Sequence, residues 1–279
     1  MTDDKHFQNV IDEKVILEGK SARRRLGLWL LVPLLVSFIV LAVFTTEWKD
    51  SLKIRRYDVT GTKIVSKQEI MTIAKAGVTK DALMYATGIG AIQEKIAAQP
   101  FVRFVTVTRE MPDILHIQIA EREPFASLNN GRQMFYIDQD GVLLPYIQSA
   151  IKLDLPIISG VNSIDHVQTG EVVSSNEIYS AIEILKTAQA IDSSLYRFIS
   201  EVNMNRGDDV TLYSVDVGVP IILGRGNVAK KLITFQSFWN TILKSQDQKK
   251  LRSVDLRFDE QVVVKWDQQT ERYPKKASL

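Results

Sequence analysis

Cysteine is absent from this 279-residue chain, and histidine is nearly so, with only His6, His116 and His166. The lack of thiols excludes disulfides, thiol catalysis and thiolate metal sites. The three histidines share no ligand spacing, so no metal site is predicted. The chain also lacks a strong excess of positive or negative charge, because 35 basic and 33 acidic residues give a net charge of +2. A nucleic-acid-binding domain is expected to be more basic, so no nucleic-acid partner is predicted.

Charge is also missing from one long apolar run, LGLWLLVPLLVSFIVLAVFTT at residues 26–46. At 1.5 Å per residue, a helix of that length extends about 30 Å, the thickness of a bilayer core. A buried core helix rarely runs so far without a polar face. A cleaved signal peptide has a shorter apolar region followed by a small-residue cleavage site, which AVFTTEWK lacks. We therefore predict an uncleaved transmembrane helix over residues 26–46.

The flanks of this run bear on its orientation. Three arginines at residues 23–25 precede it, and four cations follow between residues 49 and 56, so the positive-inside count is nearly even. The arginines abut the run, and a large C-terminal domain is translocated largely regardless of its charge. We therefore expect the N-terminus in the cytoplasm and the bulk of the chain outside it. The four following cations could contact lipid headgroups or belong to a solvated linker.

Residues 47–123 predict the order strand, helix, helix, strand, strand. A strand with Tyr57 and Val59 precedes a helix whose start carries the capping box Ser66–Glu69. A second helix is predicted over IGAIQEKIAAQ, and two alternating strands, VRFVTVTR and DILHIQIAE, surround the turn REMPD. Two helices over a three-stranded sheet can bury a small core.

Residues 124–267 predict a mostly antiparallel β domain with two packed helices, which makes the fold class α+β. MFYIDQDGVLLPY indicates a hairpin. Ser174 and Glu177 form a second capping box before one helix, and Asn227 is the expected cap of the other. VDLRFDEQVVVKW alternates with period two, as in one strand or two short strands around residues 259–261. Residues 1–25 and 268–279 are predicted to be a cytoplasmic tail and a C-terminal tail.

In this order the parts resemble the FtsQ/DivIB family of bacterial cell-division proteins, which have a short tail, one membrane helix, a POTRA (polypeptide-transport-associated) module and a β domain. IRRYDVTGTKIVSKQEI resembles the start of the POTRA module. PFVRFVTVTREMPDILHIQIAEREPFA resembles its paired strands and the domain junction, and YIDQDGVLL, LGRGNVAKKLITF and VDLRFDEQVVVKW resemble landmarks of the β domain. The resemblance covers nearly all of the chain after residue 25, although residues 148–170 match nothing in the family.

The resemblance implies a scaffold without enzymatic activity or cofactor, at the division septum of the cytoplasmic membrane, with its bulk in the periplasm if the cell is Gram-negative. It implies binding to the small membrane proteins FtsB/DivIC and FtsL, and recruitment to the septum through the POTRA module. Family members use the C-terminal strand region to receive a segment of the FtsB/DivIC-type partner. An aromatic residue at the DLRF position and a tryptophan eight residues later match Phe258 and Trp266.

The predicted partner-binding residues are therefore Phe258, Val262, Val264 and Trp266. Because it is last in the sequence, the strand at residues 262–266 could lie at a sheet edge, where unpaired backbone groups invite another strand. From the sequence alone, an ordinary core hairpin with both aromatics buried is the favoured alternative.

Two other classes of function stay open. Gly224, Gly226 and Ala229 fit G-x-G-x-x-A between a strand and a helix, as in a dinucleotide-binding βαβ unit. Such a site needs several parallel units and only one is visible, which favours a simple tight turn. An outer-membrane assembly or secretion component also carries POTRA modules, but together with a barrel or several repeats.

Two smaller motifs have simple structural explanations. Asp138 and Asp140 suggest Ca²⁺ ligation, but position 12 of such a loop is Ser149 instead of glutamate, so a hairpin turn is expected. His116 lies in a predicted strand and is expected to face solvent. The chain contains no G-x-S-x-G motif, so a catalytic role for this histidine is not indicated.

Overall fold

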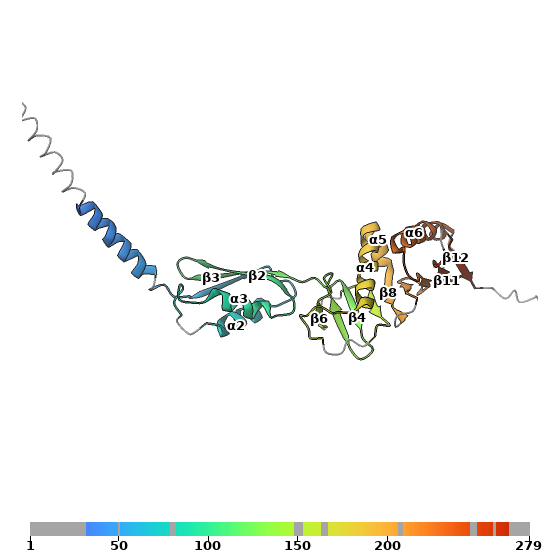
Figure 1. The fold of residues 1–279 in the computed structure, drawn as a ribbon, viewed down its shortest axis with the longest axis horizontal. Helices are drawn as coiled ribbons and strands as arrows, with labels where there is room; N and C mark the ends of the chain where they lie inside the picture. The colour runs from blue at the N-terminus through green and yellow to red at the C-terminus, as the bar shows by residue number, and fades with distance from the viewer. Residues whose placement is uncertain are drawn as a thin grey trace, which may run out of the picture. The chain divides into compact units, whose positions relative to one another are not determined.

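The computed structural model describes residues 32–49, 51–78, 82–147, 153–162, 167–205, 209–245, 250–258 and 261–267 (Figure 1). The two predicted tails, residues 1–25 and 268–279, lie outside this part of the chain, as do residues 148–152 and 163–166 of the stretch without family resemblance.

The first described element is an apolar helix, Val32–Lys49, which is long and apolar enough to span a membrane. It continues three residues beyond the predicted end at residue 46, and residues 26–31 of the predicted span lie outside the described part. Its apolar side chains are exposed. The prediction of an N-terminal apolar helix is confirmed.

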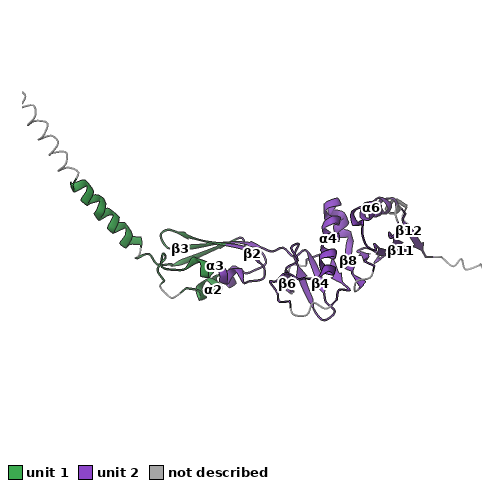
Figure 2. Ribbon diagram, viewed as in Figure 1, with its two compact units in different colours: residues 1–60, 71–93, 106–118 green, residues 61–70, 94–105, 119–279 purple. Residues whose placement is uncertain are grey.

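The described chain forms two compact units (Figure 2). The first contains Met1–Thr60, Met71–Gln93 and Thr106–Gln118, and the second contains Gly61–Ile70, Glu94–Val105 and Ile119–Leu279. The division between the units passes through the β-α-α-β-β module, so one part of that module belongs to the same unit as the large sheet that follows.

The β-α-α-β-β module has the predicted order. Its elements are β1 (Arg56–Thr60), α2 (Lys67–Ala76), α3 (Ile89–Ala97), β2 (Val102–Glu110) and β3 (Ile114–Glu121). The strand order is β1-β3-β2, and β1 runs parallel to β3. At the start of α2, the hydroxyl of Ser66 accepts a hydrogen bond from the backbone N–H of Glu69 at 3.1 Å, which confirms the predicted cap.

The strands described after the module form one nine-stranded sheet, in the order β12-β11-β10-β9-β8-β7-β4-β5-β6. Its strands are β4 (Ala126–Asn129), β5 (Met134–Ile137), β6 (Leu143–Pro145), β7 (Ile157–Ser159), β8 (Ile199–Asn203), β9 (Thr211–Ser214), β10 (Pro220–Ile222), β11 (Leu251–Asp255) and β12 (Val263–Trp266). The pairs β4–β7, β7–β8 and β10–β11 are parallel and the other five are antiparallel. The sheet is therefore mixed, and the α+β class is confirmed.

Helices α4 (Asn176–Ile191), α5 (Ser193–Phe198) and α6 (Val228–Ser245) accompany this sheet, so the described part contains one short helix more than the two predicted. The helix α4 packs against α6. Their apolar stripes enter one core with the sheet. The stripes include Ile178, Ala181, Ile182, Leu185 and Ala188 from α4, and Leu232, Phe235 and Trp239 from α6.

The predicted capping box Ser174–Glu177 is wrong by one residue. Ser175 is the N-cap of α4, and its side chain accepts from the backbone N–H of Ile178. The carboxylate of Glu177 accepts instead from the backbone N–H and the side-chain amide of Asn162, at 2.7 and 2.6 Å. Because two serines are adjacent, the S-x-x-E spacing selects the wrong one.

Within the second unit, the end of β3 is joined to neighbouring segments by polar contacts. Glu121 accepts hydrogen bonds from three consecutive backbone N–H groups, those of Lys63, Ile64 and Val65, at 2.7–2.9 Å. Arg122 pairs with the buried carboxylate of Asp138 at 2.8 Å. The first contacts join the end of β3 to residues 63–65, and the ion pair joins the residue after β3 to the hairpin β5–β6 of the large sheet.

Candidate partner-binding edge

The strand β12 is the last strand at one end of the nine-stranded sheet. It pairs antiparallel with β11, with Val254 opposite Val264 and Asp255 opposite Val263. Among the described strands none pairs with its other side, so β12 is the edge strand that the sequence predicted. An edge strand presents backbone donors and acceptors to any further strand.

The alternating apolar residues of this hairpin divide into three classes of exposure. Val254 and Leu256 are buried in the core, while Val262 and Val264 are half-buried and pack against it. The two aromatics are exposed, Phe258 at 52% and Trp266 at 39% of their surface. The core-hairpin alternative required both aromatics to be buried, and this part of it is wrong.

The four predicted contact residues thus lie in and beside β12. Val264 and Trp266 belong to the strand itself, Val262 directly precedes it, and Phe258 follows β11. Phe258 also borders a small hollow beside the first turns of α6, with Lys230, Lys231 and Thr234 on its other side.

One ion pair joins the two strands of the hairpin, and a second lies at the end of β11. Arg252 pairs with Asp267, and the backbone N–H of Asp267 donates to the carbonyl of Lys250. At the other end, Arg257 contacts the carboxylate of Asp255 at 2.7 Å. The contacts of Asp267 therefore join the end of β12 to the start of β11.

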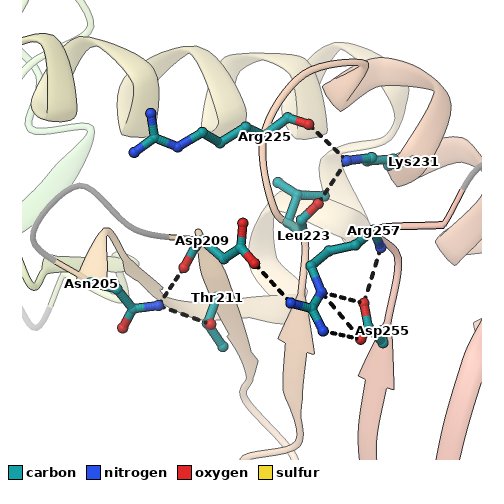
Figure 3. Close-up of polar contacts among 8 residues, drawn as sticks. All are labelled: Asn205, Asp209, Thr211, Leu223, Arg225, Lys231, Asp255 and Arg257. Carbon is teal, nitrogen blue, oxygen red and sulfur yellow. Dashed lines mark hydrogen bonds and ion pairs between the residues drawn. The ribbon is translucent and has the colours of Figure 1, made fainter.

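Arg257 also reaches across to Asp209, at 2.9 Å, so that its guanidinium bridges two carboxylates (Figure 3). Side-chain hydrogen bonds from Arg257 hold the pKa of Asp255 below its ordinary value, and its bonds to both carboxylates raise the pKa of Arg257. Asp209 is 48 residues away in sequence, and no motif in the sequence indicated this bridge. The pair Asp255 and Arg257, two residues apart on a predicted strand, was the one available signal.

The glycine turn at residues 224–226 connects β10 to α6, and β10 and β11 are parallel neighbours. The predicted βαβ layout is therefore real. The turn is filled by the protein itself, because Nζ of Lys231 donates to the carbonyls of Leu223 and Arg225, both at 2.9 Å (Figure 3). A Cβ on Gly224 would lie 2.7 Å from Cγ of Arg257. Close packing accounts for Gly224 without a ligand.

A cleft of about 310 Å³ lies beside this turn, between it and α4. Glu177 and Glu183 line it together with Arg225, and the remaining wall includes Ile184 and Met204. A pyrophosphate needs a positive surround at the helix N-terminus. Two carboxylates in the cleft oppose that requirement, which weighs against a dinucleotide site.

The side chains of the smaller motifs are also bonded to other residues of the chain. Asp138 lies in the turn of the hairpin β5–β6, as predicted, and one of its oxygens accepts from the backbone N–H groups of Asp140 and Val142. His116 on β3 is half-buried, and its Nδ1 lies 2.9 Å from Asp58 on the neighbouring β1. Within the described residues, no group of three or more histidine or acidic side chains is arranged to hold a metal.

Comparisons with known proteins agree with this architecture. Residues 52–122 match the family model "POTRA domain, FtsQ-type", and residues 123–265 match "FtsQ/DivIB, C-terminal related". The second match alone covers about half of the chain. Both matches favour a division protein over an outer-membrane assembly component.

Individual relatives cover most of the chain. The cell division protein FtsQ of Geotalea daltonii is 29% identical over 213 residues, which cover 76% of this chain and 75% of the relative. The FtsQ proteins of Salinibacter ruber and Rhodothermus marinus are each 27% identical, over 88% of this chain and 94% or 89% of the relative. The likeness therefore extends beyond any single module.

Proposed function

The chain belongs to the FtsQ/DivIB family of non-enzymatic cell-division proteins, and from that premise we propose that it is a membrane-anchored scaffold that links cytoplasmic and extracytoplasmic parts of the division machinery. Its direct partners are small membrane proteins of the FtsB/DivIC and FtsL types. The assembly acts at the division septum.

The proposed anchor is the helix Val32–Lys49 together with the apolar residues before it. The N-terminus lies in the cytoplasm, next to the arginines at residues 23–25, and the part of the chain that follows the helix lies on the other side of the membrane. In a Gram-negative cell that side is the periplasm. A C-terminal alkaline phosphatase fusion should be active in this topology, and an inactive fusion would contradict it.

The proposal of a partner site is based on the exposed edge of the sheet at β12, which is flanked by two exposed aromatic residues. An incoming strand can bond to the free backbone groups of β12, and its alternate side chains can contact Trp266 and the half-buried Val264. Phe258, next to the hollow at α6, supplies a second aromatic contact. The partner proposed for this edge is a segment of the FtsB/DivIC-type protein.

The POTRA-type module, with predicted bounds at residues 47–123, is proposed to recruit the chain to the septum. Recruitment and partner binding then belong to different parts of the chain and can be separated. A fluorescent fusion with Phe258→Ala and Trp266→Ala should still form septal bands in cells depleted of the native copy, but should fail to bring the FtsB/DivIC-type partner there. A fusion lacking residues 47–123 should form no bands.

Two results would contradict this division of labour. The first is a septal band in the fusion that lacks the module. The second is normal partner recruitment by the double aromatic variant at native expression levels. An evenly distributed full-length fusion would contradict the septal role altogether.

A further inference from the structure

We propose that one end of the first unit rests on the bilayer surface. This membrane-facing end consists of residues 82–87, the β2–β3 turn at residues 110–113 and the chain that follows the N-terminal helix. The exposed side chains of Leu83, Tyr85 and Met111 enter the lipid interface, and neighbouring cations contact acidic phospholipid headgroups. The inference goes beyond the proposed scaffold role and rests on its membrane anchor.

The first support is the short connection to the helix. The helix ends at Lys49, and the backbone carbonyl of Leu52 already accepts a hydrogen bond from the N–H of Met84, at 2.6 Å. Three residues of fully extended chain reach at most about 11 Å. The polar headgroup region is roughly 5–8 Å thick on each side of the hydrocarbon core. Leu83 is therefore held close to the headgroup layer by the covalent chain.

The second support is that the β2–β3 turn is attached to the same stretch of chain. The carbonyl of Asp113 accepts from the backbone N–H groups of Arg55 and Arg56, at 2.9 and 3.1 Å. Asp113 also pairs with the guanidinium of Arg56 at 2.9 Å. The turn that carries Met111 cannot move away from the membrane independently of the chain that leaves the helix.

Arg109 joins the remaining part of this end. Its Nε donates to the carbonyl of Met84 at 2.7 Å, and its Nη2 to the carbonyl of Thr87 at 2.8 Å. Residues 82–87 are therefore fixed to the end of β2 as well as to Leu52. The three pieces form one connected surface.

The exposed side chains of this surface suit a lipid interface. Leu83 and Tyr85 are each 39% exposed, and Met111 is 57% exposed. Tyrosine and tryptophan favour the headgroup level of a bilayer, because one end of each is apolar and the other is wet. Trp48, on the last turn of the helix, is also exposed and marks that level.

Among the described residues nearby, positive charges outnumber negative ones. The described cations at this end are Lys49, Lys53, Arg55, Arg56 and Arg109, and the described carboxylates are Glu47, Glu110 and Asp113. The guanidinium of Arg109 and the ammonium of Lys49 lie 5.5 and 6.0 Å from the ring of Tyr85. Cations beside interfacial aromatics attract acidic headgroups within a Debye length of about 8 Å. Short tether, apolar side chains and cations together favour lipid as the occupant over a protein.

The lack of cysteine provides a clean test on the full chain. Single cysteines at positions 83 and 111 (Leu83→Cys, Met111→Cys) would carry a nitroxide label, with the chain in nanodiscs of phosphatidylcholine and phosphatidylglycerol. Access of lipid-soluble oxygen and of a water-soluble nickel chelate is then compared. Phe104→Cys is the matched control, because Phe104 is also exposed but lies on β2 seven residues before Met111, roughly 23 Å along the strand.

A label at Leu41, in the middle of the helix, reports on the anchor itself (Leu41→Cys). We expect the ratio of oxygen to nickel access to be several-fold higher at positions 83 and 111 than at 104, and highest at 41. Equal ratios at 83, 111 and 104, with 41 in the hydrocarbon, would overturn this inference and leave the anchor intact. Nickel access at 41 would overturn the anchor and the inference with it.

Two further comparisons test whether lipid or a protein covers this surface. Replacing phosphatidylglycerol by phosphatidylcholine, or Arg55→Gln, should lower the oxygen ratio at position 83, whereas Arg225→Gln removes the same charge elsewhere and should not. No response to either change would overturn the headgroup contact. Shielding of position 83 in native membranes but not in nanodiscs would show that a protein covers this surface, which also overturns the proposal.

Discussion

The side chain of Arg257 occupies the space that a side chain on Gly224 would need, since a Cβ there would lie 2.7 Å from Cγ of Arg257. Gly224 also has φ of +66°, in the left-handed region that favours glycine. The turn between β10 and α6 thus depends on this glycine for two separate reasons, its backbone conformation and its close neighbour.

Gly226, two residues further along the chain, separates the effect of the backbone conformation from that of the close neighbour. It has nearly the same φ, +67°, but an added Cβ would meet nothing within 4 Å. We expect Gly226→Ala to lower the free energy of unfolding by about 1 kcal/mol, from backbone strain alone. Gly224→Ala should cost about 2 kcal/mol or more, because Arg257 must also move. Equal costs in urea denaturation would show that the contact with Arg257 contributes nothing.

Asp255 makes stability depend on pH through its bonds with Arg257. Because the native pKa of Asp255 is lowered, its contribution is fully present above the ordinary aspartate pKa of about 3.9. It is lost as the pH falls through the lower native pKa. We expect Asp255→Asn to be less stable than the wild type at pH 7, and the difference to shrink below about pH 4.

Denaturant titrations at pH 7, 5, 4 and 3 measure this difference. Asp216→Asn is the control, because Asp216 is exposed and has no described ion pair. A difference for Asp255→Asn that stays constant down to pH 3 would contradict the role of its carboxylate.

The buried pair between Arg122 and Asp138 should matter more than its exposed neighbour. Arg122→Ala leaves the nearly inaccessible carboxylate of Asp138 without its cation, although two backbone bonds to that carboxylate remain. We expect a loss of about 2–4 kcal/mol in the free energy of unfolding. Arg103 pairs with Asp140 at the same distance, 2.8 Å, but both side chains are about half exposed.

Arg103→Ala therefore serves as the matched control and should cost less than about 1 kcal/mol. Urea denaturation of both variants gives the comparison. Similar losses for the two would mean that burial does not set the strength of the pair.

Most of the order of elements was predictable from the sequence, because turn residues and apolar periods mark strands and helices locally, but the short helix α5 was not predicted. The sequence allowed an edge position for β12 but did not require it, because the last strand of a chain can also lie inside a sheet; the strand order of the structure decides between the two. The exposure of Phe258 and Trp266 was not predictable, because an alternating pattern places residues on one face of a strand without indicating how deeply they are buried.

Contacts between distant segments account for the other differences. Nothing local indicates that Asp209 meets Arg257, or that Lys231 bonds to the carbonyls of the glycine turn. The residue pattern correctly indicates a strand, a glycine turn, a helix and a further strand, but it does not indicate which side chains fill the turn. Likewise, Ser175 is the cap of α4, so the residue three positions later is Ile178, and Glu177 bonds to Asn162 instead.

The central claim is that the edge at β12 receives a partner strand through Phe258 and Trp266. Its most direct test is the affinity of the full-length chain, in nanodiscs, for a purified FtsB/DivIC-type partner, with each aromatic changed singly to alanine. Because both side chains are exposed, melting temperatures should stay within a few degrees of the wild type. Phe104→Ala, which removes an exposed aromatic from β2, is the control.

We expect Phe258→Ala and Trp266→Ala each to weaken binding by about 2 kcal/mol, roughly thirtyfold, and Phe104→Ala to bind like the wild type. Folded Phe258→Ala and Trp266→Ala variants that both bind with wild-type affinity, or an equal loss in Phe104→Ala, would contradict partner binding at this edge.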